Sequence, residues 1–256
     1  MKEILYKAAI ESGKIIKEYF ETKFIIESKD VISNLVTEVD KKSESKIIEV
    51  IRNEFPNHNI LSEEIGALDT DSDVKWIIDP IDGTINYAHS IPICCVSIGI
   101  EKKGEIIFGL VYNPMSGELF FSEKGKGAFL NDKKISISNE DNLYKSLLVT
   151  GFPYDTGNNP HKPVKVFAEF VNSDIPVRRL GSAALDLCWT ACGRFDGFWE
   201  YNLNPWDVAA GYLIMTEAGG VVSDFDGNNF SVYKKEILAT NGLIHNHMLR
   251  MIKNVK

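Results

Sequence analysis

Trp76-Ile77-Ile78-Asp79-Pro80-Ile81-Asp82-Gly83-Thr84 is the stretch that decides how this chain folds around its chemistry. It opens with three apolar residues and then places a carboxylate before a proline, which is typical of a buried strand with an acid at its carboxyl end. Proline has no N–H for a sheet ladder, so the strand is predicted to end before Pro80. Asp79 and Asp82 are then expected to face one point beyond the strand end, where α/β proteins bind their ligands.

Gly83 and Thr84 complete the motif and predict an anion site. Gly83 lets the backbone approach a ligand closely, and the N–H groups of both residues would open a following helix, which favours phosphate. One alternative is an ordinary turn with two solvated aspartates, because Asp and Gly are common in turns. Another is the haloacid-dehalogenase type of phosphatase, whose D-x-D-G-T places a nucleophilic aspartate two residues before the second. The spacing here is three, which favours metal-activated water over a phospho-aspartate.

The segment before this motif is predicted to contain two helices and a short strand. Apolar residues recur at near-helical spacing over residues 3–21, and a second helix is predicted to start after Asp40, a favourable N-cap residue. An apolar run then leads into Ser62-Glu63-Glu64, which predicts that Glu63 lies at a strand end. Taken alone, this acid pair would favour an exposed surface position.

The segment after the motif changes character near residues 138–142, a polar stretch. Before it, strands are predicted at 96–100, 106–112 and 119–122, joined by short Gly-bearing turns that indicate an antiparallel sheet. After it, strands at 147–150, 176–179, 198–199 and 221–225 alternate with helices at 162–172, 182–193, 206–218 and 241–254. Such alternation favours a layered α/β arrangement. We therefore expect an α+β half over residues 1–140, with most metal ligands, and an α/β half over 141–256 that completes the site.

A further acid, Asp207, follows Pro205-Trp206 near the start of the predicted helix at 206–218. An acidic residue in the first helical turn is favoured by the helix dipole and needs no function. Asp207 therefore indicates a functional site only in combination with the Asp79–Asp82 block.

Bulk composition excludes some functions. The chain has 256 residues, is 44% hydrophobic and carries a net charge of -8, so no nucleic-acid or membrane-surface footprint is expected. The N-terminal residues form an amphipathic pattern rather than a signal peptide, and no apolar stretch is long enough to span a bilayer. The four cysteines show no C-x-x-C pair and lie in apolar runs. They are interpreted as reduced thiols of a cytoplasmic protein.

Together these blocks resemble the inositol monophosphatase family, within the larger superfamily that includes fructose-1,6-bisphosphatase. The resemblance rests on residues 76–87, on Ser62-Glu63-Glu64, and on the segment from Pro205-Trp206-Asp207 to Gly220. Residues 179–184 and 193–200 also match, so nearly the whole chain is covered. The resemblance implies a layered αβαβα sandwich of the inositol monophosphatase or sugar phosphatase type.

The resemblance also implies a metal site. Glu63, Asp79 and the backbone carbonyl of Ile81 would hold one Mg²⁺, and Asp79, Asp82 and Asp207 would hold a second, with two or three ions in all. Every proposed ligand is a hard oxygen, which agrees with Mg²⁺ better than with zinc. Several neighbouring carboxylates cannot stay ionised together without cations between them.

The remaining roles follow from the same resemblance. Asp40 would pair with Thr84 to take a proton from the attacking water, and Glu63 joins these two as a catalytic residue. The residues implied in phosphate binding are Gly83 and Thr84, with Lys29 nearby, and those implied in contacts with the rest of the substrate are Asp82, Gly181, Ser182, Ala183 and Glu200. Asn34 stands where relatives often have aspartate, which is expected to affect metal affinity or pH optimum more than reaction type.

The expected function is Mg²⁺-dependent hydrolysis of a small phosphate monoester, with myo-inositol monophosphate as the favoured substrate. Alternatives of the same superfamily are fructose 1,6-bisphosphate, 3'-phosphoadenosine phosphate and histidinol phosphate. An alternative of another class is a regulatory binding partner, for example of the transcription machinery, with hydrolysis secondary. Inhibition by lithium and a homodimeric state are also expected from the resemblance.

Overall fold

The strand that carries Trp76 lies inside an eight-stranded sheet in the computed structural model, which describes residues 1–28, 35–153 and 156–255. This strand, β5 (Val74–Asp82), buries side chains on both faces, with Trp76 and Ile78 in one apolar cluster and Ile77 in another. Successive strand residues point to opposite faces, so two-sided burial explains the continuous apolar run. In spatial order the sheet contains β10 (Lys133–Lys134), β9 (Ala128–Leu130), β8 (Glu118–Glu123), β7 (Glu105–Asn113), β6 (Cys95–Lys102), β5, β3 (Asn59–Ser62) and β4 (Gly66–Leu68).

One detail of this sheet corrects a sequence-based expectation, and a second was not predicted. The ladder between β5 and β6 is irregular between Asp79 and Asp82, as a proline requires, but the strand continues to Asp82 instead of ending before Pro80. The sheet is antiparallel throughout except where β3 pairs parallel with β5, placing Ser62 opposite Ile78. The carboxyl ends of β3 and β5 therefore lie at the same edge.

A second sheet of five strands occupies the other half of the molecule. Its spatial order is β12 (Val177–Arg179), β11 (Leu148–Thr150), β13 (Gly197–Tyr201), β15 (Glu236–Thr240) and β14 (Val221–Ser223). Four of these strands were predicted, whereas β15 was not. β15 pairs antiparallel with both β13 and β14, so its short apolar run becomes a strand through partners that lie far away in the sequence.

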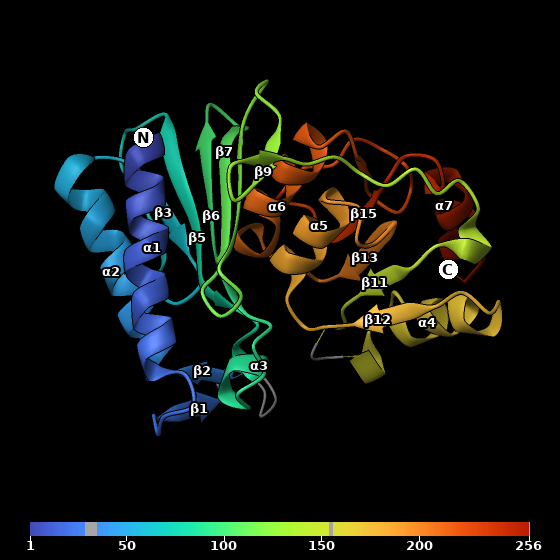
Figure 1. The fold of residues 1–256 in the computed structure, drawn as a ribbon, viewed down its shortest axis with the longest axis horizontal. Helices are drawn as coiled ribbons and strands as arrows, with labels where there is room; N and C mark the ends of the chain where they lie inside the picture. The colour runs from blue at the N-terminus through green and yellow to red at the C-terminus, as the bar shows by residue number, and fades with distance from the viewer. Residues whose placement is uncertain (29–34, 154–155, 256) are drawn as a thin grey trace.

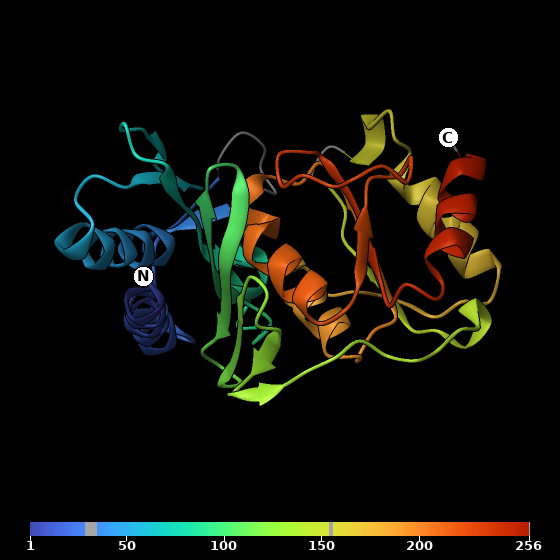
Figure 2. The same cartoon turned by 90° about the horizontal axis from the view of Figure 1, so that it is seen from above.

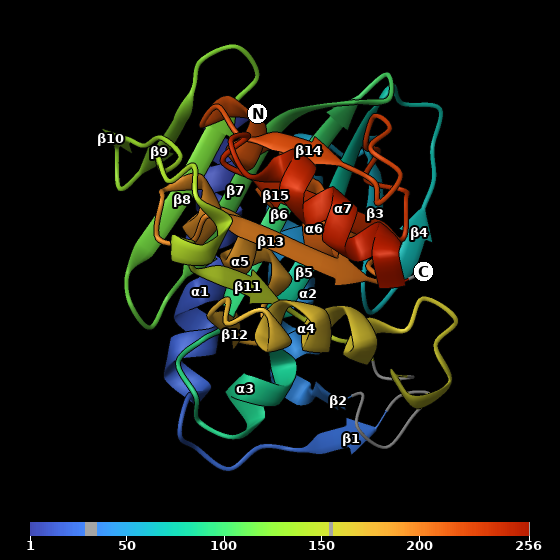
Figure 3. The same cartoon turned by 90° about the vertical axis from the view of Figure 1, so that its right-hand side faces the viewer.

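Five layers result, and three apolar clusters hold them together (Figure 1). Helices α1 (Lys2–Tyr19) and α2 (Glu38–Glu54) cover the outer face of the large sheet, α5 (Ala183–Ala191) and α6 (Pro205–Glu217) fill the space between the sheets, and α4 (Pro163–Asn172) and α7 (His245–Val255) cover the small sheet. Figure 2 shows α6 between the sheets, and Figure 3 shows α4 and α7 in front of the small sheet. The expected αβαβα sandwich is thus confirmed.

Smaller elements complete the chain. They are the antiparallel pair β1 (Ile26–Ser28) and β2 (Leu35–Thr37), the short helix α3 (Thr84–Ala88), and the 3₁₀ turns η1 (Leu143–Lys145) and η2 (Thr156–Asn158). The two sheets are joined through residues 135–147, which include the polar stretch expected at the boundary; the division into halves at 140 stays a prediction. Within the described residues, no helix is both long and apolar enough to cross a membrane.

Candidate active site

Asp79 and Asp82 lie where β5 reaches the edge of the large sheet, and both are buried. Asp79 accepts a hydrogen bond from the N–H of Ile81 through Oδ1 (3.0 Å). Gly83 follows with φ of 96°, a conformation that L side chains rarely adopt. A Cβ there would come within 2.7 Å of the Ile93 carbonyl oxygen, so the turn needs glycine for two independent reasons.

Glu63 reaches the same edge from the neighbouring strand. The parallel pairing of β3 with β5 ends at Ser62, and the Glu63 N–H donates to the Ile78 carbonyl (3.2 Å). Glu44 of α2 is buried under this turn and accepts hydrogen bonds from the Ser62 hydroxyl and the Glu64 N–H (3.0 Å). Glu44, which sequence reasoning missed, therefore fixes the turn that carries Glu63.

Asp40 contacts the motif from the start of α2, but it is not the N-cap residue that was predicted. Thr37 is the N-cap, and Asp40, the third helical residue, closes a capping box by accepting from the Thr37 N–H (2.9 Å) through Oδ2. The other oxygen, Oδ1, accepts from the Thr84 hydroxyl (3.1 Å). The structure thus places Asp40 against Thr84, the pairing that the resemblance implied.

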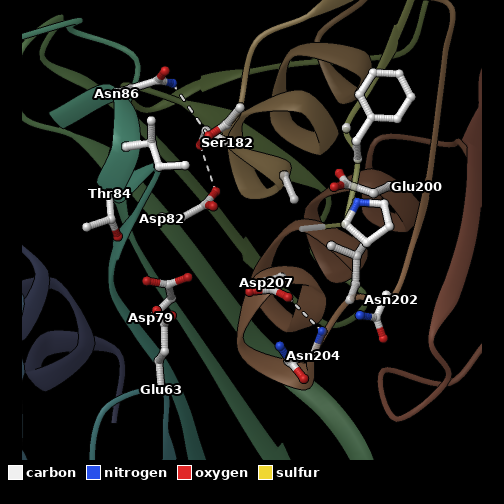
Figure 4. Close-up of a pocket in the computed structure, with 18 of the residues that line it drawn as sticks. Glu63, Asp79, Asp82, Thr84, Asn86, Ser182, Glu200, Asn202, Asn204 and Asp207 are labelled. Carbon is white, nitrogen blue, oxygen red and sulfur yellow. Dashed lines mark hydrogen bonds between the residues drawn. The ribbon is translucent and has the colours of Figure 1, made fainter. Parts of the chain in front are cut away.

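Asp207 is held at the start of α6 by the same device. The α6 helix begins at Pro205, and the Asn204 N–H donates to Asp207 Oδ2 (2.6 Å). Asp207 therefore does have the structural role at the helix start that the helix dipole alone would favour. However, Asp207 also lines a cavity with the β5 carboxylates, from the other side of the cleft between the sheets (Figure 4).

The second half of the chain also holds Asp82 directly. The Ser182 hydroxyl donates to Asp82 Oδ2 at 2.6 Å (Figure 4). The Ala184 N–H donates to the same oxygen at 2.7 Å. Asn86 of α3 adds a link across the cleft by donating to the carbonyls of Ile93 and Leu180, both at 2.8 Å. Ser182 was expected to contact substrate; in the structure it contacts a predicted metal ligand.

One cavity of about 490 Å³ collects these groups. Its wall contains every predicted site residue except Asp40 and Lys29, namely Glu63, Asp79, Ile81, Asp82, Gly83, Thr84, Gly181, Ser182, Ala183, Glu200 and Asp207. Asp40 contacts the wall through Thr84, whereas Lys29 and Asn34 lie outside the described residues. The wall also contains Arg179 and Lys235, two cations that sequence reasoning did not single out as substrate contacts.

Burial and mutual repulsion make these carboxyl groups hard to ionise. Burial, followed by the charge of Glu63, raises the pKa of Asp79 and of Asp207 well above the ordinary value. Burial also raises the pKa of Asp82 to about 6, although the hydrogen bond from Ser182 opposes the shift. A divalent cation would relieve the repulsion that contributes to these shifts.

The donor set fits a hard cation such as Mg²⁺. Four carboxylates and one backbone carbonyl are all oxygen ligands. In Asp207, the hydrogen bond from the Asn204 N–H engages Oδ2, which leaves Oδ1 for a cation. Among the described residues, no three acidic, His or Cys side chains are already close enough to hold a metal ion together. The fit therefore rests on the chemistry of the donors and not on a preassembled cluster.

A layered sandwich that gathers opposed carboxylates beside an Asp-Gly-Thr turn defines a class of proteins, the hydrolases of small phosphate esters. The chain belongs to the inositol monophosphatase family, whose model matches residues 1–256.

Three relatives illustrate the similarity. The chain is 44% identical over 247 residues to the inositol-1-monophosphatase of Synechocystis sp.. The matched region covers 96% of this chain and 86% of that protein. It is 41% identical over 256 residues to the Nus factor SuhB of Escherichia coli K12, which covers 99% of this chain and 96% of that protein. The structure of an inositol monophosphatase from Anabaena (Nostoc) sp. matches with a TM-score of 0.90 and 42% identity, covering 99% and 95% of the two chains. The chain is therefore a phosphatase of a family that is generally metal-dependent.

Proposed function

We propose that this phosphatase hydrolyses myo-inositol monophosphate to myo-inositol and phosphate, with two or three Mg²⁺ ions at the carboxylate cluster. The observation that supports the proposal is that one cavity contains both the Asp79–Thr84 block and the Glu200–Asp207 block. The first block comes from the large sheet and the second from the small sheet and α6. A phosphate ester bound in this cavity therefore meets charged groups on both sides.

Each carboxylate has a proposed role. Glu63, Asp79 and the Ile81 carbonyl would hold one ion, and Asp79, Asp82 and Asp207 would hold another. When bound, the ions would activate the attacking water as Lewis acids and would neutralise charge on the leaving alkoxide. Because carboxylates from both halves take part, the metal site depends on the two halves keeping their relative positions.

Thr84 and Asp40 are proposed to accept the proton released by the attacking water. The Thr84 hydroxyl lies 3.0 Å from the Ile81 carbonyl and 3.1 Å from Asp40 Oδ1, but its single hydrogen can be donated to only one of them. If the Ile81 carbonyl binds a cation, the hydrogen is directed to Asp40. Burial raises the pKa of Asp40 to about 7, which is a favourable value for a group that exchanges protons near neutral pH.

The two ends of the substrate are recognised by different chemistry. Gly83 and Thr84 are proposed to bind the phosphate at the turn. Glu200, on the opposite wall, is a carboxylate that can accept hydrogen bonds from the hydroxyls of an alcohol. A polyol is therefore favoured over an alcohol without hydroxyls. Arg179 and Lys235 on the same wall would also bind a second phosphate, which keeps fructose 1,6-bisphosphate as the alternative substrate.

The proposal is tested by measuring kcat/KM for myo-inositol 1-phosphate, fructose 1,6-bisphosphate, 3'-phosphoadenosine phosphate and histidinol phosphate, with Mg²⁺ and with EDTA. We expect the highest value for the inositol ester, no activity in EDTA, and recovery on adding Mg²⁺. Glu200→Gln is expected to reduce inositol ester turnover by about 1–3 kcal/mol in transition-state terms, and p-nitrophenyl phosphate turnover much less. Full activity in metal-free buffer, or a bisphosphate preference, would refute the proposal.

Other expectations remain predictions of the resemblance: inhibition by lithium, a homodimer and a cytoplasmic location. A primarily regulatory role is less favoured, because a binding partner has no need of four carboxylates in one cavity. One relative is named a Nus factor, so a stable stoichiometric partner together with negligible turnover would support that alternative.

A further inference from the structure

The Glu200 carboxylate occupies the space where a side chain at position 151 would begin. Gly151 follows β11, and Glu200 is the fourth residue of β13. A Cβ built on Gly151 would come far closer than 3.0 Å to Oε1, Oε2 and Cδ of Glu200, which real Cβ atoms essentially never do. Any residue other than glycine at 151 would therefore displace this carboxylate.

Strand pairing produces this juxtaposition. β11 and β13 run parallel, with Thr150 opposite Trp199. The next residue along β11 is Gly151 and the next along β13 is Glu200, so these two residues lie side by side. The Thr150 hydroxyl donates to the Trp199 carbonyl (2.6 Å) and joins the two strand ends. The two backbones therefore cannot separate easily to make room for a side chain.

The glycine is not required by the backbone itself. Gly151 is not among the residues with a positive φ, so alanine could adopt its conformation. The three nearest atoms to a Cβ at this position all belong to the far end of the Glu200 side chain, which can rotate. A substitution at 151 is thus expected to move one carboxylate instead of disrupting the fold.

A displaced Glu200 side chain can rotate into the cavity that it already lines. Asp186 of α5 is buried, both of its oxygens have no hydrogen-bond partner among the described residues, and Glu200 lies close enough to raise its pKa. On the α5 side the buried Asp186 carboxyl group leaves little room, whereas the cavity is open space. The cavity is where the leaving alcohol is proposed to bind (Figure 4).

We propose that Gly151 is the positioning residue that determines where the Glu200 carboxylate lies, and through it the preference for hydroxyl-rich alcohols. This inference takes the identity of the substrate from the proposed function and rests on it. Without a side chain at 151, the carboxylate stays at the wall and can accept hydrogen bonds from ring hydroxyls. With a side chain there, the carboxylate would occupy part of the alcohol's space.

The test is a double-mutant cycle of Gly151→Ala and Glu200→Ala, measured with Mg²⁺ on myo-inositol 1-phosphate and on p-nitrophenyl phosphate. Gly151→Ala is expected to raise KM for the inositol ester about tenfold or more. This is the loss in binding expected when one hydrogen bond to a charged group is removed. The kcat of this variant, and its turnover of p-nitrophenyl phosphate, are expected to change much less. In the Glu200→Ala background the same substitution should have no further effect, because the carboxylate is gone.

Gly157 offers a matched control. It lies in η2 and lacks a positive φ, and none of the described residues comes within 4 Å of a built Cβ, so Gly157→Ala is expected to leave both substrates unaffected. Additive effects of Gly151→Ala and Glu200→Ala, or an unchanged KM in Gly151→Ala, would overturn the inference.

Thermal unfolding separates this inference from the proposed function. Gly151→Ala is expected to lower the unfolding temperature, and Glu200→Ala is expected to remove that loss by opening the space. This coupling is measurable even if the wild type does not hydrolyse the inositol ester, an outcome that would refute the proposed substrate alone. If Gly151→Ala unfolds and the double variant folds, the conflict with Glu200 is supported. If neither folds, the inference is wrong.

Discussion

Ser182→Ala tests whether the second half of the chain positions a metal ligand of the first. Ser182 is buried, and its hydroxyl donates to Asp82 Oδ2 at 2.6 Å. The Ala184 N–H donates to the same oxygen at 2.7 Å and remains in the variant. The substitution therefore removes one of the donors that hold the carboxylate, without changing its charge.

The magnitude follows from the type of hydrogen bond lost. A hydrogen bond to a charged group contributes about 1.5–3 kcal/mol, which corresponds to about 10- to 150-fold in a binding constant. Removing a partner that orients a metal ligand typically costs about 10- to 100-fold in metal affinity. Since the Ala184 N–H still restrains Asp82, we expect the lower end, about tenfold.

The assay is the Mg²⁺ concentration for half-maximal phosphatase activity. It should rise in Ser182→Ala while kcat at saturating Mg²⁺ changes much less. Ser138→Ala is a matched control, because the Ser138 hydroxyl donates to Asp196 at 2.6 Å and neither residue lines the cavity. That variant is expected to lose stability with no change in Mg²⁺ requirement.

Two results would contradict this reasoning. An unchanged Mg²⁺ requirement in Ser182→Ala would show that the remaining donors position Asp82 without Ser182. Equal shifts in Ser182→Ala and Ser138→Ala would show that both act through overall stability.

Three further predictions concern the carboxylates. Asp207→Asn removes charge but little volume, so kcat should fall about a hundredfold or more; near wild-type kcat at saturating Mg²⁺ would exclude a ligand role. Glu44→Ala releases the turn that carries Glu63, and we expect about tenfold weaker Mg²⁺ activation together with a lower unfolding temperature; a loss of stability alone would make Glu44 purely structural. Burial raises the pKa of Asp40 to about 7 and of Glu200 to about 8, from about 4 when unfolded. Because the folded state binds these protons more tightly than the unfolded state, the fold loses stability as pH rises from about 4 to about 8. The metal-free protein should therefore unfold at a higher temperature at about pH 6 than at about pH 8.5; a flat profile would mean that these groups titrate normally.

Local sequence signals were sufficient where one short segment decides its own structure. The apolar run before Asp79 and the proline after it predicted a buried strand with acids at its end, and the acids lie there. The helix at 206–218 was predicted within one residue of its start, because proline favours the first helical position.

Signals that depend on a distant partner were misread or missed. Asp40 was interpreted as an N-cap, but Thr37 three residues earlier provides the cap and frees Asp40 Oδ1 for Thr84. β15 was not predicted, because its five residues gain their strand structure by pairing with β13 and β14. β-structure depends on such pairing more than helix does, so short strands are the least visible in sequence.

The sequence by itself determined which residue types are present for the chemistry: hard-oxygen ligands in blocks whose spacing favours metal-activated water over a phospho-aspartate. Only the tertiary structure decided how those blocks meet. The contact of Ser182 with Asp82, and of Glu200 with the space beside Gly151, joins residues that lie 100 and 49 positions apart. Such contacts depend on how two sheets pack around α5 and α6. Local propensity does not encode that packing, which results from burying three apolar clusters at once.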